Sequence, residues 1–482
     1  MKKHSLFKVI LIVLGALVCL NGLFTILGLA GVKAFESFKM IPIGDVFLNF
    51  VQSFYYFFDT LVFLMVLGAF YAVLNKIPAY KKLVDNIAQK VKAHSKLFVF
   101  IVTILFAILT SATGLVNVLM VFVPFVIAII LLLGYDKLVA ISSTIVAMLV
   151  GFMGGVFVTF RDANSYYGYA STTFTKFAGV KMYANLVPQL IILVLCTALL
   201  ILFINKYIKS VQDKKVKYEL NDSDEVIVSE VKGDYKTIKT WPIIVILSLI
   251  FVILVLGYMP WNDLFGIKCF DKFDEWLKGL SVGEFAVIPS ILSGYLYSFG
   301  SWASLGSYMC IIITLIIFTI IIKFIYRVKF DELVEDFMSG AKKMIPMVFL
   351  VAISYAILVC AYNFEFISNF ITLIGDKLGM NLVTSSLLSV IGTLFHGDLY
   401  YTTTGVFANI NSLADESLLS TYAMTYQSIY GLVSAIAPTS LLVIFALKYF
   451  DVPYTSWVKY IWRFVLMLFL LVILVLLVLS LI

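Results

Sequence analysis

One stretch near the C-terminal end of the chain places chemically active side chains inside an apolar region. His396 and Asp398 are the only acidic or basic residues within 378–414, and Thr403 and Thr404 follow them. A carboxylate inside a membrane is costly and therefore predicts a function. Asp398 could take a proton, a sodium ion or a substrate ammonium group, and His396 could pass a proton. The alternative is a pair in a short loop at the membrane surface.

A second polar cluster lies in the middle of residues 97–135, a run of 39 residues without a charged side chain. As one helix this run would be about 58 Å long, whereas the hydrocarbon core of a bilayer is about 30 Å thick. The chain must therefore break or turn back, and small polar residues mark the place. We predict the tip of a re-entrant hairpin there, formed by Ser111, Thr113, Gly114 and Asn117. Packing of helices through small residues is the alternative.

Two further clusters could contact a ligand. Arg161, Asp162 and Asn164 follow a glycine-rich run, and an arginine there could clamp a substrate carboxylate through two hydrogen bonds. The alternative is an Arg–Asp pair at an external helix end.

The last cluster combines a proline with two hydroxyl side chains. Pro438, Thr439 and Ser440 lie inside an apolar run. A proline frees a backbone carbonyl that a hydroxyl group or an ion can then satisfy. A simple proline kink explains the same residues equally well.

The composition indicates which elements must position these clusters. The chain has 482 residues, of which 62% are hydrophobic and 13% are charged, about half the charged fraction of a soluble domain. The apolar runs are continuous, as in membrane helices. We predict an all-α polytopic membrane protein with about 10–12 transmembrane helices plus re-entrant hairpins. Among the spanning runs are 55–75, 138–160 and 421–447, while 281–300 and 399–413 resemble interfacial or re-entrant pieces.

The usual signatures of catalysis and of nucleic-acid binding are missing from the sequence. The three histidines show no zinc-binding spacing, and no nucleotide-binding fingerprint occurs. We therefore expect no catalytic residues, no cofactor, no nucleic-acid partner and no enzymatic activity. The metal is unknown, although a sodium ion could bind at the hairpin tips, and a sodium ion or a proton could serve as the coupling ion.

The positions of the basic residues predict how the chain is oriented in the membrane and where it divides into two halves. Lysine and arginine gather at the N-terminus and in 76–96, 206–239 and 323–343, which the positive-inside rule assigns to the cytoplasm. Residues 31–54 and 259–280 then lie outside, and the N-terminus is cytoplasmic in a multi-pass protein of the cell membrane. The polar stretch 209–240 reads as a cytoplasmic linker between the membrane halves 1–208 and 241–482.

The two halves resemble each other weakly. Residues 67–74 align with 351–358, and residues 112–117 align with 403–409. Because the basic residues give the two segments opposite orientations, we predict two inverted repeats, about 55–206 and 343–482, a common plan in transporters.

Several motifs in order resemble a known family. Residues 44–76 and 123–152, the segment Phe-Met-Ser-Gly-Ala-Lys-Lys-Met at 337–344 and the segment Ala-Pro-Thr-Ser at 437–440 are similar to those of YfcC-like carriers. These belong with the C4-dicarboxylate anaerobic carriers (DcuC-type) of the ion transporter superfamily. The resemblance implies a secondary carrier, two inverted repeats with a re-entrant hairpin and a broken helix each, and a homodimer. By the resemblance, the hairpin tips and helix breaks meet at the substrate site.

The sequence also departs from that family pattern. Its first hairpin tip carries Ser, Thr and Asn in place of acidic residues, and Arg161 and Asp162 fall where an Asn-Pro-Phe segment is expected. The substrate of the relatives therefore does not transfer directly. We expect a sodium- or proton-coupled carrier of a small polar metabolite, such as a dicarboxylate, an amino acid or a short peptide. An uncoupled exchanger of amino acids is the alternative, ahead of a channel or a membrane scaffold.

Overall fold

The computed structural model describes residues 5–155, 185–213, 238–291, 298–302, 308–395, 397–398, 405–406, 408–413 and 418–480. Within this part of the chain, 8 helices are long and apolar enough to cross a membrane. They are Ser5–Leu29, Phe58–Lys76, Pro78–Thr113, Leu186–Gln212, Trp241–Tyr258, Met309–Tyr326, Phe330–Asn363 and Tyr454–Val478. Three shorter apolar helices accompany them, at Val116–Leu132, Lys137–Met153 and Leu382–Phe395. The protein is therefore an all-α polytopic membrane protein, as predicted.

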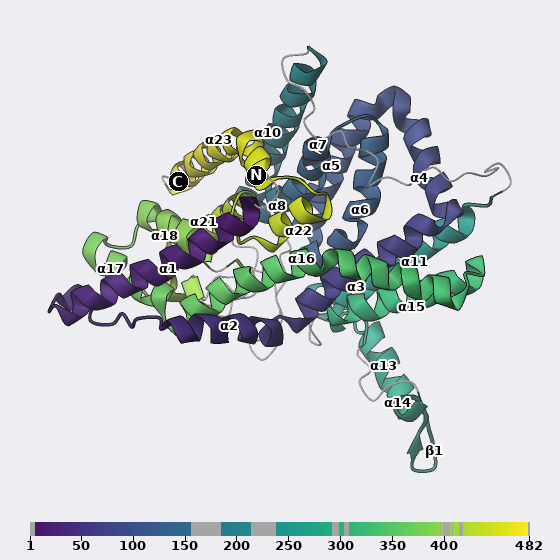
Figure 1. Ribbon diagram of the computed structural model, residues 1–482, viewed down its shortest axis with the longest axis horizontal. Helices are drawn as coiled ribbons and strands as arrows, with labels where there is room; N and C mark the ends of the chain where they lie inside the picture. Colours follow the sequence, from purple (N-terminus) through teal and green to yellow (C-terminus); the bar gives the residue numbers. More distant parts are fainter. Residues whose placement is uncertain are drawn as a thin grey trace.

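Two long helices form the centre of the molecule (Figure 1). Helix α3 (Phe58–Lys76) packs along α16 (Phe330–Asn363) more extensively than any other pair of helices in the described part. Glycines allow the close approach: a β-carbon on Gly340 would lie 2.5 Å from the β-carbon of Ala72 and 2.6 Å from the carbonyl oxygen of Gly68. The two backbones thus touch without a side chain between them.

Helix α2 (Ile43–Tyr56) extends the line of α3 along α16 and falls within the stretch predicted to lie outside the membrane. The hydroxyl of Ser53 donates to the carbonyl of Ala352 at 2.9 Å, while Phe47, Val51 and Tyr55 are exposed. One face is therefore packed and the other is apolar and free, which is an amphipathic pattern. The 34-residue α16 also begins well before the predicted run at 343, because the charged segment from residue 330 onward is helical.

The predicted hairpin follows α4 (Pro78–Val91) and the short η2 (Lys92–His94). Helix α5 (Ser95–Thr113) and helix α6 (Val116–Leu132) run side by side in Figure 1. The start of α5 and the segment just after α6 also lie close together, since the hydroxyls of Ser95 and Tyr135 are 3.1 Å apart. The two helices therefore turn back on each other.

A broken element comes next. Helix α7 (Lys137–Ile141), the π-helical turn η3 (Ser142–Val146) and helix α8 (Ala147–Met153) form a continuous rod that ends at Gly154. Within the predicted run 138–160, the described helix therefore contains a π-helical turn and ends at Gly154. Helix α10 (Leu186–Gln212) follows, and a β-carbon on Gly151 would overlap the carbonyl group of Ala107, so α8 packs directly on α5.

An arm projects from the helical body between α11 (Trp241–Tyr258) and α15 (Met309–Tyr326) (Figure 1). Its elements are α12 (Trp261–Phe265), α13 (Cys269–Gly279), β1 (Ser281–Val282), β2 (Phe285–Ala286) and α14 (Val287–Ile291). The two strands pair antiparallel and are largely exposed. This part of 281–300 is therefore a projecting hairpin and no re-entrant piece.

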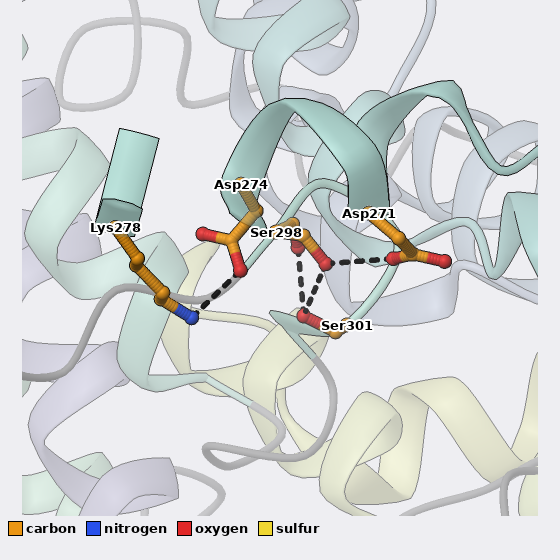
Figure 2. A network of polar contacts seen from close by, with 5 residues as sticks. All are labelled: Asp271, Asp274, Lys278, Ser298 and Ser301. Carbon is orange, nitrogen blue, oxygen red and sulfur yellow. Dashed lines mark hydrogen bonds and ion pairs between the residues drawn. The ribbon is translucent and has the colours of Figure 1, made fainter. Parts of the chain in front are cut away.

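Hydrogen bonds hold the base of this arm together, as Figure 2 shows. The hydroxyl of Ser298 donates to Asp271 at 3.0 Å, and the hydroxyl of Ser301 donates to the carbonyl of Ser298 at 2.7 Å. Lys278 pairs with Asp274 at 2.6 Å, one turn apart on α13. These contacts tie α13 to the chain that leads back into α15.

The remaining elements follow α16. They are α17 (Phe366–Leu378), α18 (Leu382–Phe395), α20 (Ala408–Ser412), α21 (Leu419–Ser434), α22 (Leu441–Tyr449) and α23 (Tyr454–Ser480), while α1 (Ser5–Leu29) and η1 (Lys33–Phe35) open the chain. The predicted run 421–447 is two helices separated by residues 435–440. Helix α1 packs on α16 and α23. The chain ends thus close around the central pair.

Candidate functional site

The first hairpin tip forms where the sequence predicted a break. Helix α5 ends at Thr113, and Gly114 takes the left-handed conformation with φ +65°, which glycine adopts without strain. The hydroxyl of Thr113 donates to the carbonyl of Leu109 at 2.6 Å and accepts from the N–H of Leu115 at 3.2 Å. Asn117 lies in the first turn of α6. The predicted turn is confirmed, and the hydroxyl of Thr113 satisfies some of the backbone groups that are freed at the turn.

The same tip touches the first interrupted helix. The hydroxyl of Ser111, which is buried, donates to the carbonyl of Gly154 at 2.7 Å. Gly154 and Gly155 follow the end of α8, where backbone carbonyls need partners from outside the helix. A hairpin tip is thus joined to a chain break by one short hydrogen bond.

A buried glutamine from the second half completes this region. The side-chain N–H groups of Gln427, on α21, donate to the carbonyl of Phe152 at 2.8 Å and to that of Gly155 at 3.3 Å. Gln189, on α10, donates to the side-chain oxygen of Gln427 at 3.4 Å. The sequence analysis missed Gln427, since an amide within a helix carries no distinctive pattern.

The second interrupted helix lies between α21 and α22 and contains the predicted Pro438, Thr439 and Ser440, all of them buried. The hydroxyl of Thr439 donates to the carbonyl of Leu394, at the end of α18, at 2.8 Å. The hydroxyl of Ser354, on α16, donates to the carbonyl of Thr439 at 2.7 Å. The proline therefore marks a full break and not a simple kink.

Helix α23 satisfies the other carbonyls freed by this break. The indole N–H of Trp457 donates to the carbonyl of Ala435 at 3.0 Å. The hydroxyl of Tyr454 donates to the carbonyl of Ile436 at 2.8 Å. Ser440 contributes its backbone carbonyl, which accepts from Ile444 at 2.9 Å and starts α22. Non-helical backbone survives at membrane depth only with such partners.

Asp398 lies beside this second break. A β-carbon on the preceding Gly397 would come within 2.5 Å of the carbonyl oxygen of Thr439, so only glycine fits there. The hydroxyl of Tyr430 donates to the carbonyl of Gly397 at 3.2 Å. The half-buried carboxylate of Asp398 is close enough to act electrostatically on Tyr355 and Tyr430. The predicted acid thus lies near the interrupted helix, the buried Tyr355 and the half-buried Tyr430.

One helix reaches both interrupted regions. Gln427 and Tyr430 lie three residues apart on α21, which places them on neighbouring positions of one face. Gln427 binds the carbonyls at the end of α8, and Tyr430 binds the carbonyl of Gly397. Gly431 also packs against Leu149 and Met153 of α8. The structure therefore brings the two clusters together through α21.

Other predicted residues fall outside the described part of the chain. They are Arg161, Asp162, Asn164, His396, Thr403 and Thr404. Their predicted contacts with a substrate or an ion stay predictions. In the described residues no group of three His, Cys, Asp or Glu side chains is arranged to hold a metal ion.

Comparison with known proteins gives the family. The profile of the C4-dicarboxylate anaerobic carrier family (DcuC) matches residues 56–481. The chain belongs to this family. It is therefore a multi-pass membrane transporter.

Two individual proteins are also similar to the carrier. An uncharacterized protein of Haemophilus influenzae is 24% identical over 168 residues, which are 35% of this chain and 31% of that protein. The alignment thus covers about a third of the relative. The crystal structure of the YdaH transporter of Alcanivorax borkumensis, described as having an unusual topology, superposes with a TM-score of 0.40 at 14% identity, over 97% of both chains.

The carrier holds a second buried carboxylate that the sequence analysis did not select. Asp59, in the first turn of α3, accepts from the N–H of Thr60 at 2.8 Å and from that of Tyr308 at 3.4 Å. Thr60 in turn hydrogen-bonds Tyr355, whose ring stacks on Phe57 with centroids 3.7 Å apart. An acid before an apolar run looks like a helix-end residue, and only packing against α15 and α16 buries it.

At the open end of the hairpin, Asp136 caps α7. One carboxylate oxygen accepts from the N–H of Val139 at 2.9 Å, and the other accepts from the hydroxyl of Tyr207 at 2.6 Å. Burial raises the pKa of Asp136 above its ordinary value, and the hydrogen bonds from Tyr207 and Val139 oppose this rise. This contact fixes the base of the hairpin to α10.

Proposed function

We propose that the protein is a secondary active transporter that moves a small carboxylate-bearing metabolite across the cell membrane and is coupled to protons or sodium ions. The observation that carries this proposal is that α21 joins the end of α8 to the region of the broken helix α21–α22. Broken helices near the membrane midplane are where transporters bind substrates, because the freed backbone groups can contact a ligand.

The ends of the broken helices suit an anionic substrate. Helix α22 begins at Leu441 directly after Thr439 and Ser440, and a helix N-terminus presents N–H groups and a partial positive charge. We propose that a substrate carboxylate binds near these hydroxyls, with Arg161 as its ion-pair partner. The family description supports a dicarboxylate as the first candidate, with amino acids and short peptides next.

Asp398 is our proposed coupling residue. It is a half-buried carboxylate near the buried Tyr355 and the half-buried Tyr430, and intramembrane acids commonly bind protons or cations. Asp59 is linked to the same Tyr355 through Thr60. A cation or proton taken up near Asp398 would offset the negative charge of an arriving carboxylate, which is a direct physical basis for coupling.

We further propose inverted repeats around residues 55–206 and 343–482. In support, the elements of the first repeat have counterparts in the same order in the second. The first set is α3, α4, the α5–α6 hairpin, α8 and α10. The second set is α16, α17, α18, the break between α21 and α22, and α23. A cytoplasmic N-terminus, a linker at 209–240 and a homodimer belong to the same proposal. Cysteine labelling from each side of oriented vesicles tests the orientation.

Uptake by proteoliposomes tests the function. Purified protein is reconstituted, and labelled dicarboxylates, amino acids and short peptides are screened with an imposed sodium or proton gradient. We expect uptake of at least one carboxylate that collapses when the gradient is removed. Uptake that depends only on a counter-substrate inside the vesicle would support the exchanger and contradict coupling.

A further inference from the structure

A cavity of about 130 Å³ lies away from the two chain breaks. It is enclosed by α3, α4, α6, α16 and α22, at the end of the molecule that carries Lys76 and Lys343. Its polar lining consists of Tyr71, Asn75, Tyr80, Lys343 and Tyr449. Pro124, which also lines it, is seven residues beyond Asn117, about 10 Å along α6. The cavity is therefore separate from the hairpin tip.

The polar groups of this cavity are mostly donors. Tyr80 is only 1% exposed, and among the described residues its hydroxyl has no hydrogen-bond partner. Tyr71 donates to the carbonyl of Val121 at 2.6 Å, and the hydroxyls of Tyr71, Tyr80 and Tyr449 are close enough to act on one another electrostatically. Phenolic hydroxyls that line a small cavity can donate hydrogen bonds to a molecule bound in it.

The charge of the cavity selects the class of ligand. Lys343 supplies an ammonium group at the exposed mouth, and within the described part of the chain no carboxylate lies within 4 Å of it. Lys76 pairs with Asp336 at 3.8 Å, whereas the side chain of Lys343 is exposed to solvent. An ammonium, an amide and phenolic O–H groups around one small space are complementary to an anion.

We propose that this cavity binds the carboxylate or phosphate group of a small molecule, at a site distinct from the two chain breaks. Its placement on the cytoplasmic side depends on the orientation in the proposed function, but the binding itself does not. Because the lining comes from α3 and α16 as well as from α6 and α22, an occupied cavity would hold the central pair against the hairpin and the broken helix. A bound anion would therefore oppose relative movement of these elements.

Hydrogen–deuterium exchange of the full-length protein in nanodiscs tests the proposal, with succinate and inorganic phosphate as probes. We expect either anion at millimolar concentration to slow exchange in peptides that contain residues 71–80 and 340–344. Protection by succinate alone identifies a carboxylate site, and protection by phosphate identifies a phosphate site. No protection of these peptides by either anion would overturn the proposal.

Two variants and a neighbouring control sharpen the test. Lys343→Gln should raise the Kd of the protecting anion about tenfold, the effect of losing one charge-assisted hydrogen bond. Tyr80→Phe keeps the ring, removes the unpaired hydroxyl and should weaken binding several-fold. Lys342→Gln, one residue away on α16, should leave the Kd unchanged. Equal anion affinities of the Lys343 and Lys342 variants would refute the site. If a preparation shows no uptake but still binds the anion, the proposed function fails while the proposed cavity site stands.

Discussion

The two interrupted regions of the carrier satisfy their freed carbonyls in different ways. At the first, a hairpin hydroxyl (Ser111) and an amide from the other half of the chain (Gln427) bind the end of α8. At the second, the donors are Trp457 and Tyr454 of α23, and Thr439 binds the neighbouring α18. The first region thus depends on the second half, whereas the second region is built from its own half.

The two regions also differ in charge. The described part of the first tip offers hydroxyl and amide groups only, in Ser111, Thr113 and Asn117, while the second carries the carboxylate of Asp398. Neutral dipoles can orient a ligand but cannot exchange a charge with it. Under the proposed function, both regions would contact the substrate and only the second would carry the coupling.

The largest effect should come from the charge that distinguishes the second region. Asp398→Asn keeps the shape and removes the carboxylate, so we expect gradient-driven uptake to fall by more than about tenfold, while exchange of substrates persists. The measurement is uptake with and without an imposed gradient. Asp376→Asn, an exposed acid on α17, is the control and should be silent. Normal coupled uptake by the Asp398 variant would remove this residue from the mechanism.

The next effect concerns the dependence of the first region on the second half. Gln427→Leu leaves the carbonyls of Phe152 and Gly155 without their donor, at a cost of about 2–4 kcal/mol in the free energy of unfolding. Thermal unfolding in detergent measures the change, and Gln212→Leu on an exposed surface of α10 serves as the reference. Equal stability of the two variants would show that Gln427 is not a structural tether.

A smaller effect is expected at the base of the first hairpin. Tyr207→Phe removes the hydrogen bond to Asp136, which favours the ionised carboxylate and contributes about 1.5–3 kcal/mol. Because burial raises the pKa of Asp136 in the folded state, the folded protein is stabilised when this group takes up a proton, and that stabilisation is lost as the pH rises through the folded pKa. The variant should therefore lose most stability at neutral pH and less in acid.

Melting curves of the Tyr207 variant and the parent protein between neutral pH and about pH 4 measure this dependence. The gap between the two proteins should narrow toward acid. A gap that is constant across the range would mean that Tyr207 acts through ring packing and not through the carboxylate.

The smallest effects should come from the hydroxyls of Ser111 and Thr439, each of which joins one of the two regions to a neighbouring helix. Ser111→Ala and Thr439→Val each remove one hydrogen bond, at 2.7 Å and 2.8 Å respectively, and each should cost about 1 kcal/mol in stability. If the two regions share the substrate, both variants should raise the KM for uptake. A change in only one of them would show that substrate contact is confined to that region.

The sequence predicted much of this arrangement where a local rule decides the outcome. The uncharged run of 97–135 was too long for one crossing, and Gly114 is where it turns. Pro438 removes a backbone donor, and the helix breaks around it. In both cases one residue type imposes the backbone geometry, so no knowledge of distant contacts was needed.

Other features depend on contacts that the sequence does not display. The sequence predicts 76–96 only as a basic cytoplasmic segment and not as helix α4, because its lysines mask an apolar face formed by Tyr80, Leu83 and Val84. Gln427 and Asp59 owe their burial to helices far away in the chain. Single polar residues become parts of a site only when packing excludes water from them, which no local pattern records.

The crossing of Gly68 and Gly340 sets a limit on how the carrier can move. With no side chain between the two backbones, sliding α3 along α16 would drive β-carbons of neighbouring residues into the opposing main chain, at a high steric cost. We therefore expect α3 and α16 to move together as one rigid unit. We expect any rearrangement that opens the carrier first to one side of the membrane and then to the other to be carried by the hairpin and the broken helix, which would move relative to α3 and α16.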